Sequence, residues 1–316
     1  MKQPITGIHH VTAIAGDPQR NIDFYAGLLG LRMVKKTVNF DDPSAYHLYY
    51  GDAAGSPGSI VTFFYWPGHD ARGRVGPGQT TALVFSAPAD SLGFWKDRLE
   101  RNGVSVKNVT RFGEETLSFS DPDRIPVEIV AVADDARQGW PGAGIPAAQA
   151  LRGLHTAELT VRQPAPTESL LSGVMGFRLV RREGNRARFE AGPGGSGRYA
   201  DVIGQPDTPS GAGGAGTIHH IAWSVPDDES QLAKQEELHD AAYHVSPVMD
   251  RDYFHSIYYR ERGGILFEIA TENPGFAVDE TPDALGTALK LPAMHEPARG
   301  RIERILPPIG AARVYA

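Results

Sequence analysis

Alternating hydrophobic and polar positions organise residues 217–270, which begin with the run TIHHIAWSV and end with the run GGILFEIA. Both runs have the two-residue period of a half-buried β-strand, which places every second side chain on one face of a sheet. The run SIYYR and the turn ERGG come just before the last strand, so a hairpin at this turn sets Tyr258 opposite Glu268. The pattern predicts that His220 and Glu268 point into one cavity, with a tyrosine hydroxyl beside the carboxylate.

The same order of elements recurs four times along the chain. A strand, a helix and three further strand-like runs can be followed through residues 6–66, and the order repeats in residues 79–132, 152–204 and 217–270. Turn-rich Asp, Pro, Ser and Gly positions separate the runs. Each copy is therefore predicted to be a βαβββ module.

The ends of the helices support the repeat. Asp17, followed by a proline, begins the first helix as its N-cap. The first three helices end at Gly30, Gly103 and Gly176, which are 73 residues apart (103 − 30 and 176 − 103). A constant spacing of this kind indicates an internal repeat. The fourth helix lacks such a glycine, so the fourth module is the most divergent.

Four such modules predict an α+β fold. A Gly- and Pro-rich stretch between the second and third copies suggests two domains, 1–146 and 147–316, each holding a pair of modules. The tail 271–316 is expected to wrap around the body. A metal-binding cup is nevertheless expected between modules 6–66 and 217–270, because these two contain the paired histidines.

Composition narrows the chemistry. The 316 residues contain no cysteine, which excludes disulfides, thiolate metal ligands and a catalytic thiol, so any metal must be held by His, Asp or Glu. The net charge of −7, without a concentrated basic block, argues against nucleic acid and anionic membranes as partners. No apolar run approaches the roughly 20 residues of a membrane helix. A cytoplasmic protein with a small-molecule ligand is expected, and homo-oligomers are common at this size.

Two histidines and one carboxylate are the candidate metal ligands. Alignment of the first strands places His10 on His220, and Glu268 faces the latter from the last strand. This set is the facial triad of non-haem Fe(II) enzymes, which leaves three positions of an octahedral ion open, and Mn(II) accepts the same ligands. Glu128 lies on the equivalent last strand of the second module, but no histidine accompanies it. We therefore interpret Glu128 as structural.

A single histidine in an apolar strand is more often a packed core residue than a ligand. Two His-His pairs at corresponding repeat positions, with a carboxylate facing one of them, favour the metal site. Arg251 could equally form a surface ion pair with a neighbouring aspartate. Tyr258 could be a core aromatic, and only its pairing with Glu268 favours a functional role.

The chain resembles the vicinal oxygen chelate (glyoxalase/bleomycin resistance/extradiol dioxygenase) superfamily over nearly all of its length. The segments HHVTAIAGD, FYAGLLGLRMVKKTVNFDDP, TIHHIAWSV and DRDYFHSIYYRERGGILFEIATENPGF are similar to those of ring-cleaving para-hydroquinone 1,2-dioxygenases. The resemblance implies that the βαβββ modules pair into two cup-shaped half-barrel sheets and that one cup holds Fe(II), with His10, His220 and Glu268 as ligands. It also implies an arginine and a tyrosine beside the metal, at Arg251 and Tyr258.

Further residues are candidates for catalysis. His255, three residues before Tyr258, is a possible proton shuttle, and Thr12 follows the first histidine pair. The family places histidines such as His9 and His219 near the substrate, whereas strand alternation turns them to the face away from the metal. A bulged strand would reconcile the two expectations. Packing beneath the module interface is the structural alternative for both histidines.

The expected function is a non-haem Fe(II)-dependent ring-cleaving dioxygenase that inserts both atoms of O₂ into a hydroquinone- or catechol-type aromatic. Arg251 would stabilise negative charge on oxygen, and Tyr258 would hydrogen-bond the substrate. One alternative is a glyoxalase-type metal-dependent lyase or isomerase, in which a fourth protein ligand closes the metal shell. A second alternative is a binding protein of the antibiotic-resistance type, for which the histidine pairs would have no use.

Overall fold

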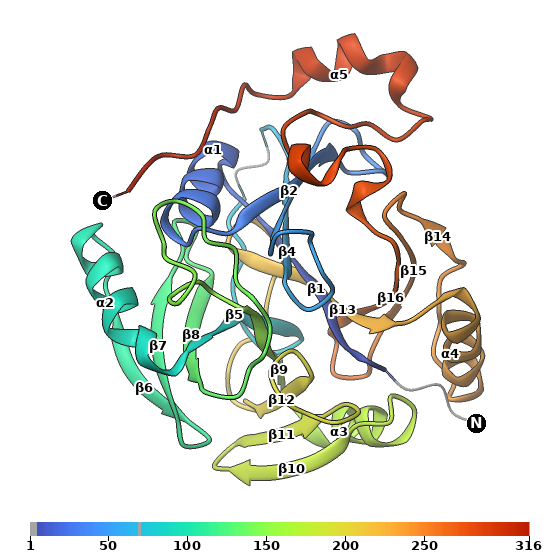
Figure 1. Cartoon of the computed structure of the whole chain (residues 1–316). Helices are drawn as coiled ribbons and strands as arrows, with labels where there is room; N and C mark the ends of the chain where they lie inside the picture. The colour runs from blue at the N-terminus through green and yellow to red at the C-terminus, as the bar shows by residue number, and fades with distance from the viewer. Residues whose placement is uncertain (1–4, 69–70, 316) are drawn as a thin grey trace.

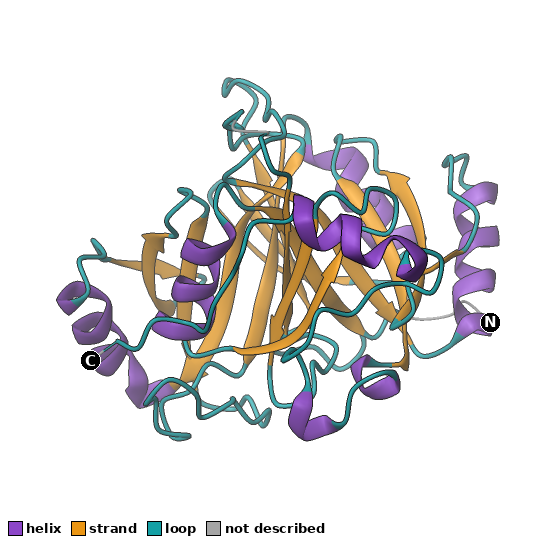
Figure 2. Ribbon diagram, turned by 90° about the horizontal axis from the view of Figure 1, so that it is seen from above, coloured by secondary structure: helices purple, strands orange, loops and turns teal. Residues whose placement is uncertain are grey.

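Two eight-stranded sheets form the body of the molecule (Figure 1). The computed structural model describes residues 5–68 and 71–315. Each sheet curls into a half-barrel, and the helices lie around the outside of the strands (Figure 2). The predicted α+β class with paired modules in two cup-shaped sheets is confirmed.

The first sheet joins the first and the last module. Its two central strands, β1 and β13, pair antiparallel, and each runs parallel to the last strand of its own module, β4 or β16. The strand order is β14 (Met249–Asp250), β15 (Phe254–Arg260), β16 (Leu266–Pro274), β13 (Thr217–Val225), β1 (Gly7–Ile14), β4 (Ile60–Tyr65), β3 (Tyr46–Gly51) and β2 (Arg32–Val38).

The second sheet has the same plan and joins the two middle modules. Its strand order is β10 (Arg178–Glu183), β11 (Arg186–Glu190), β12 (Tyr199–Gly204), β9 (Gly153–Val161), β5 (Gln79–Pro88), β8 (Pro126–Val132), β7 (Glu114–Ser120) and β6 (Lys107–Arg111). The sheets therefore cut across the chain halves 1–146 and 147–316, because each sheet takes one module from either half.

Each module places one helix between its first and second strands. These helices are α1 (Pro18–Ile22) with its π-helical continuation η1 (Asp23–Leu28), η2 (Ala89–Ser91) with α2 (Leu92–Arg101), α3 (Pro164–Gly173) and α4 (Asp228–Asp240). Asp17 caps α1 by accepting a hydrogen bond from the backbone of Arg20. Gly30, Gly103 and Gly176 adopt φ values of 70°, 81° and 77°, the left-handed conformation of a helix C-terminus. In the fourth module Ala242 takes this conformation with φ of 59°.

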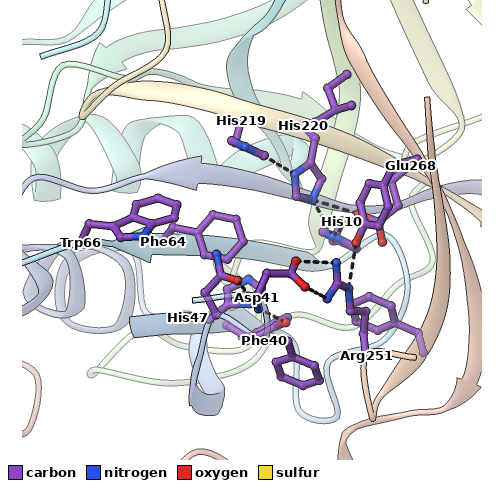
Figure 3. A pocket seen from close by; sticks show the side chains of 15 residues that line it. His10, Phe40, Asp41, His47, Phe64, Trp66, His219, His220, Arg251 and Glu268 are labelled. Atoms are coloured by element: carbon purple, nitrogen blue, oxygen red, sulfur yellow. Dashed lines mark hydrogen bonds and ion pairs between the residues drawn. The ribbon is translucent and has the colours of Figure 1, made fainter. Parts of the chain in front are cut away.

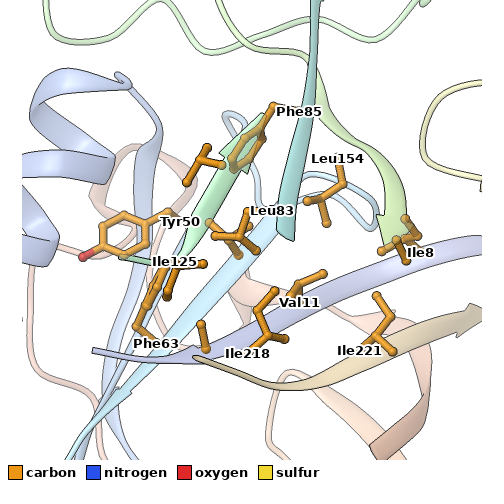
Figure 4. Packing of buried hydrophobic residues seen from close by; sticks show 14 of the residues in the cluster. Ile8, Val11, Tyr50, Phe63, Leu83, Phe85, Ile125, Leu154, Ile218 and Ile221 are labelled. Atoms are coloured by element: carbon orange, nitrogen blue, oxygen red, sulfur yellow. The ribbon is translucent and has the colours of Figure 1, made fainter. Parts of the chain in front are cut away.

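The main core lies between the two sheets, where the central strands of one cross those of the other (Figure 4). Ile8, Val11, Ile218 and Ile221 point from the first sheet toward Leu83, Phe85 and Leu154 of the second. All seven side chains are buried. Because these residues occupy the convex faces, the opposite face of each sheet is left as the inside of a cup.

The tail after β16 crosses the first module and includes η3 (Phe276–Val278), η4 (Pro282–Ala284), η5 (Glu296–Ala298) and α5 (Arg299–Ile305). It is fastened by the buried Lys35, whose ammonium group lies 2.5 Å from a carboxylate oxygen of both Asp279 and Glu280. Within residues 5–68 and 71–315, every helix is too short or too polar to cross a membrane.

Candidate metal centre

A β-bulge in β1 determines where His9 and His10 point. Ile8 and His10 pair with successive residues of β13, so His9 is an extra residue in the ladder. The extra residue allows Ile8 and Val11 both to enter the core, although simple alternation would place them on opposite faces. His9 and His10 then both lie on the cup side, with their Nδ1 atoms 2.9 Å apart.

Strand β13 repeats this arrangement. Ile218 and His220 pair with successive residues of β1, so His219 is the extra residue, and Ile218 and Ile221 both enter the core. The Nδ1 atoms of His219 and His220 lie 2.7 Å apart. The expectation from alternation, that His9 and His219 face away from the cup, is therefore wrong, because the bulges shift both strands by one residue.

Three ligand atoms converge at the centre of the first sheet (Figure 3). The Nε2 atoms of His10 and His220 are 3.3 Å apart, and Oε2 of Glu268 lies 3.0 Å from Nε2 of His220 and 3.5 Å from Nε2 of His10. All three side chains are at most 5% exposed. They are the three residues that the sequence predicts as ligands, and they come from both ends of the chain.

The charge of Glu268 favours a cation at this point. Ser256 donates a hydrogen bond to Oε1, whereas Oε2 is buried and has no hydrogen-bond partner of normal geometry. Burial by itself raises the pKa of Glu268, but His10 and His220 outweigh this effect and hold the pKa well below its usual range. Burial is the largest influence on His220 and lowers the pKa of its imidazole. A buried carboxylate oxygen beside two imidazole lone pairs is the donor set that a divalent metal requires.

The neighbouring histidines orient the two ligands. A metal-binding Nε2 leaves the imidazole proton of His10 on Nδ1, which donates to Nδ1 of His9, and His220 donates to His219 in the same way. Burial and the neighbouring imidazole lower the pKa of His9 to about 3. The pKa of His219 is also lowered to about 3 by the surrounding protein and by His220, although the residue keeps an exposed side, so both histidines are neutral acceptors. Hydrogen bonds of this kind fix the ring orientation of metal-binding histidines.

A cavity of about 340 Å³ opens beside the three ligand atoms. Aromatic side chains make up much of its wall, and the polar groups gather at its inner end and its rim (Figure 3). Besides the three ligands, the lining residues are Asn39, Phe40, Asp41, His47, Tyr49, Phe64, Trp66, His219, Arg251, Phe254, Tyr258 and Leu266. A single substituted aromatic ring fits a cavity of this size and lining.

Arg251 and Tyr258 line this cavity together. Tyr258 pairs with Glu268 across the β15–β16 ladder, as the hairpin pattern predicts. Nε of Arg251 donates to the Tyr258 hydroxyl at 3.3 Å, and its two Nη atoms donate to Asp41 at 3.2 and 3.0 Å. Burial and the charge of Glu268 raise the pKa of Tyr258, so its hydroxyl stays protonated and can donate.

Two predicted residues do not reach the cavity. His255 lies on the other face of β15, where its Nδ1 is 2.6 Å from a carboxylate oxygen of Asp228 at the start of α4. Residues three apart on a strand face opposite sides, so the same strand cannot aim both His255 and Tyr258 inward. Thr12 does lie on the cup face, but its hydroxyl meets that of Thr62 at 2.7 Å and does not line the cavity.

A group of residues beside the ligands was not predicted. Thr62 occupies the ladder position in β4 that Glu268 occupies in β16, since Thr12 pairs with Thr62 where Ala222 pairs with Glu268. Its hydroxyl lies 2.8 Å from Nε2 of His47, whose Nδ1 is 2.9 Å from the hydroxyl of Tyr49. The alternation of the run AYHLYYGD, aligned with SIYYR by the repeat, is the signal that could have revealed these side chains.

Comparisons with known proteins give the family. The Glyoxalase/Bleomycin resistance protein/Dioxygenase superfamily model matches residues 7–129 and 153–269. The chain is 46% identical to "Putative ring-cleaving dioxygenase MhqO" of Bacillus subtilis, over 98% of both chains. It is 33% identical to the chlorohydroquinone/hydroquinone 1,2-dioxygenase of Sphingobium indicum, over 97% of both.

A solved structure agrees with these matches. The crystal structure of a "putative dioxygenase" from Bacillus subtilis is 44% identical and superimposes with a TM-score of 0.94, covering 98% of this chain and 99% of the other. Family model, relatives and fold therefore agree along nearly the whole sequence. The chain belongs to the Glyoxalase/Bleomycin resistance protein/Dioxygenase superfamily.

Proposed function

We propose that this protein is a non-haem Fe(II)-dependent ring-cleaving dioxygenase that inserts both atoms of O₂ into a hydroquinone-type aromatic. The observation that carries the proposal is the convergence of His10, His220 and Glu268 beside an aromatic-lined cavity. The similarity to a chlorohydroquinone/hydroquinone 1,2-dioxygenase supports the reaction and the class of substrate.

The two Nε2 atoms and Oε2 of Glu268 would hold the metal. When bound, a metal with three protein ligands supplies open positions for substrate and O₂ and lowers the pKa of a coordinated hydroxyl. Fe(II) is preferred to Mn(II) in the proposal because ring cleavage with O₂ is the reaction of the named relative. Side chains of this protein would bind and orient the substrate.

Arg251, Tyr258 and His219 would act on the bound ring. The guanidinium group of Arg251 lies against the cavity and can stabilise negative charge that develops on oxygen. The protonated hydroxyl of Tyr258 can donate a hydrogen bond to the same oxygen. Since His219 accepts through Nδ1, its Nε2 carries the remaining proton, and the residue lines the cavity. The aromatic wall positions the ring and excludes water.

The glyoxalase-type alternative needs a fourth protein ligand. The position related to Glu268 by the repeat is Thr62, and its hydroxyl is already hydrogen-bonded to Thr12 and His47. A neutral side chain with both partners in place argues against a closed, four-ligand metal shell. A pure binding protein would leave the buried Oε2 of Glu268 without compensation.

Oxygen uptake tests the proposal. The protein is loaded anaerobically with Fe(II) and mixed with a panel of hydroquinones and catechols in the presence of ¹⁸O₂. We expect O₂ consumption with hydroquinones and ring-opened products that contain two ¹⁸O atoms. Two results would contradict the proposal. One is that the iron-loaded protein consumes no O₂ with any dihydroxybenzene, and the other is that it isomerises an α-oxoaldehyde thiol adduct without O₂.

A further inference from the structure

An ion pair spans the rim of the cavity between the first and the last module. Arg251, between β14 and β15, holds Asp41, between β2 and β3, through two parallel hydrogen bonds of 3.2 and 3.0 Å. The arginine side chain is only 15% exposed, whereas that of the aspartate is 63% exposed. Two-pronged pairs of this geometry are stronger and more directional than ordinary surface ion pairs.

Asp41 is fixed at this position by its own segment. Its backbone N–H donates to the side chain of Asn39, and the carbonyl of the preceding Phe40 accepts a hydrogen bond from His295 of the tail. Asn39, Phe40 and Asp41 all line the cavity. The carboxylate is thus presented to Arg251 by a segment that is held on both sides.

Contacts with Asp41 and Tyr258 engage all three nitrogens of Arg251. Its Nη atoms engage Asp41, and its Nε engages the hydroxyl of Tyr258. Among the described residues that line the cavity, Arg251 is the one arginine or lysine, and Asp41 and Glu268 are the carboxylates. A carboxylate on the substrate therefore finds the two-pronged edge of this guanidinium already occupied by Asp41.

The net charge of the cavity also disfavours a substrate with a carboxylate. With a divalent metal, Glu268, Arg251 and Asp41 in place, the site carries one net positive charge, which one phenolate neutralises. A ring that brought a carboxylate as well would leave an uncompensated negative charge in an aromatic-walled cavity, which is costly. Such a ring would have to displace Asp41 from Arg251.

We propose that Asp41 is a specificity-determining residue that makes the site select uncharged dihydroxybenzenes and reject those with an anionic ring substituent. The inference rests on the proposed function, since it concerns the ring that the metal site binds. Asp41 acts by repelling the anionic group and by occupying the guanidinium that would otherwise receive it.

The test uses two ligands that differ only in charge. (2,5-Dihydroxyphenyl)acetate and (2,5-dihydroxyphenyl)acetamide are titrated, with unsubstituted hydroquinone, into the anaerobic Fe(II)-loaded protein by calorimetry, so that binding is measured without turnover. In the unaltered protein we expect the amide to bind at least tenfold more tightly than the acetate. In Asp41→Asn this ratio should fall about tenfold, because an amide of the same shape removes the repelling charge.

Two controls make the result decisive. Asp207→Asn removes the same charge from an exposed position outside the cavity and should leave the ratio unchanged. Asp41→Ala serves as a second variant and should shift the ratio in the same direction as Asp41→Asn. The specificity proposal is overturned if the ratio is unchanged in both Asp41 variants, or if Asp207→Asn shifts it equally. In either case, binding of hydroquinone would still support the proposed function. Failure of the unaltered protein to bind any of the three rings overturns both.

Discussion

The two cups are built on the same ladder but hold different chemistry. Glu128 pairs with Val84 in the second sheet as Glu268 pairs with Ala222 in the first, so the two glutamates occupy the same place. Asp201 likewise occupies the place of Thr62. The second cup therefore has one carboxylate more than the first at these positions. Among the described residues, however, its His, Asp and Glu side chains do not form a group of three with the geometry of a metal site.

The difference lies in the first strands. Where the first cup has His10, the second has Thr156, placed by the same bulge one residue after His155. Because no imidazole stands at the positions of His10 and His220, arginines neutralise the carboxylates: Arg111 pairs with Glu128 at 3.1 Å. The buried Arg188 holds Asp201 at 2.8 Å and also contacts Glu114. Both cups thus have carboxylates at the same positions of the fold. The first cup adds two histidines that complete a candidate metal site, whereas in the second cup arginines neutralise the negative charges.

Removal of a ligand should have the largest effect. His10→Ala, His220→Ala and Glu268→Ala should each abolish iron retention and O₂-dependent turnover, because two remaining ligands leave the site incomplete. Glu128→Ala, at the matched position of the second cup, should keep its iron. Metal analysis after gel filtration, together with O₂ uptake, measures both. Loss of iron from Glu128→Ala but not from Glu268→Ala would reverse the assignment of the two cups.

Removing an arginine that neutralises a buried carboxylate of the second cup should lower the stability of the protein and leave metal binding unchanged. Arg188→Met leaves Asp201 buried without its partner, which should lower the free energy of unfolding by about 3–5 kcal/mol. The double variant Arg188→Met/Asp201→Leu should recover most of this loss because the buried charge of Asp201 is removed together with its partner, and Glu114 keeps its contact with His155. Urea unfolding gives the energies, and iron content should be unchanged in both proteins. Loss of iron with normal stability would show that the second cup serves the metal site.

Much of the fold could be predicted because the repeat is local. The glycines at 30, 103 and 176 need a left-handed conformation, and alternation identifies the strands without knowledge of their partners. Which modules share a sheet is not a local property. It followed only from the need for His10 to meet His220, whereas the chain halves 1–146 and 147–316 suggested a different grouping.

The site was predictable only in part for a similar reason. Alternation gave His220 and Glu268, but it failed at His9 and His219 because a bulge inserts one residue into the count. The bulge is visible in the sequence as the spacing of Ile8 and Val11. Both are apolar core residues although they are three residues apart, which simple alternation does not allow. Asp41 lies 210 residues from Arg251, so no pattern along the chain could have paired them.

Loss of Arg251 should affect chemistry more than metal binding. Arg251→Ala should retain iron and lower kcat and kcat/KM together by about 10² to 10³, the usual loss for one donor to a developing oxyanion. Tyr258→Phe should cost less, because the ring remains and only one hydrogen bond is lost. Steady-state kinetics with iron content and melting temperature distinguish this from packing. Normal kinetics with a lower melting temperature would make Arg251 a structural residue.

The smallest expected effect compares the histidines at the two bulges. His219 accepts a hydrogen bond from the ligand His220, whereas His155, at the bulge of the second cup that corresponds to the bulge of His9, contacts Ser196 and Glu114. His219→Gln should weaken metal binding about 10- to 100-fold by releasing the orientation of His220, and His155→Gln should leave it unchanged. Competition with a chelator of known affinity measures the metal dissociation constants. If both variants weakened binding equally, the loss would reflect a general effect of the substitution on the protein and not the hydrogen bond to His220.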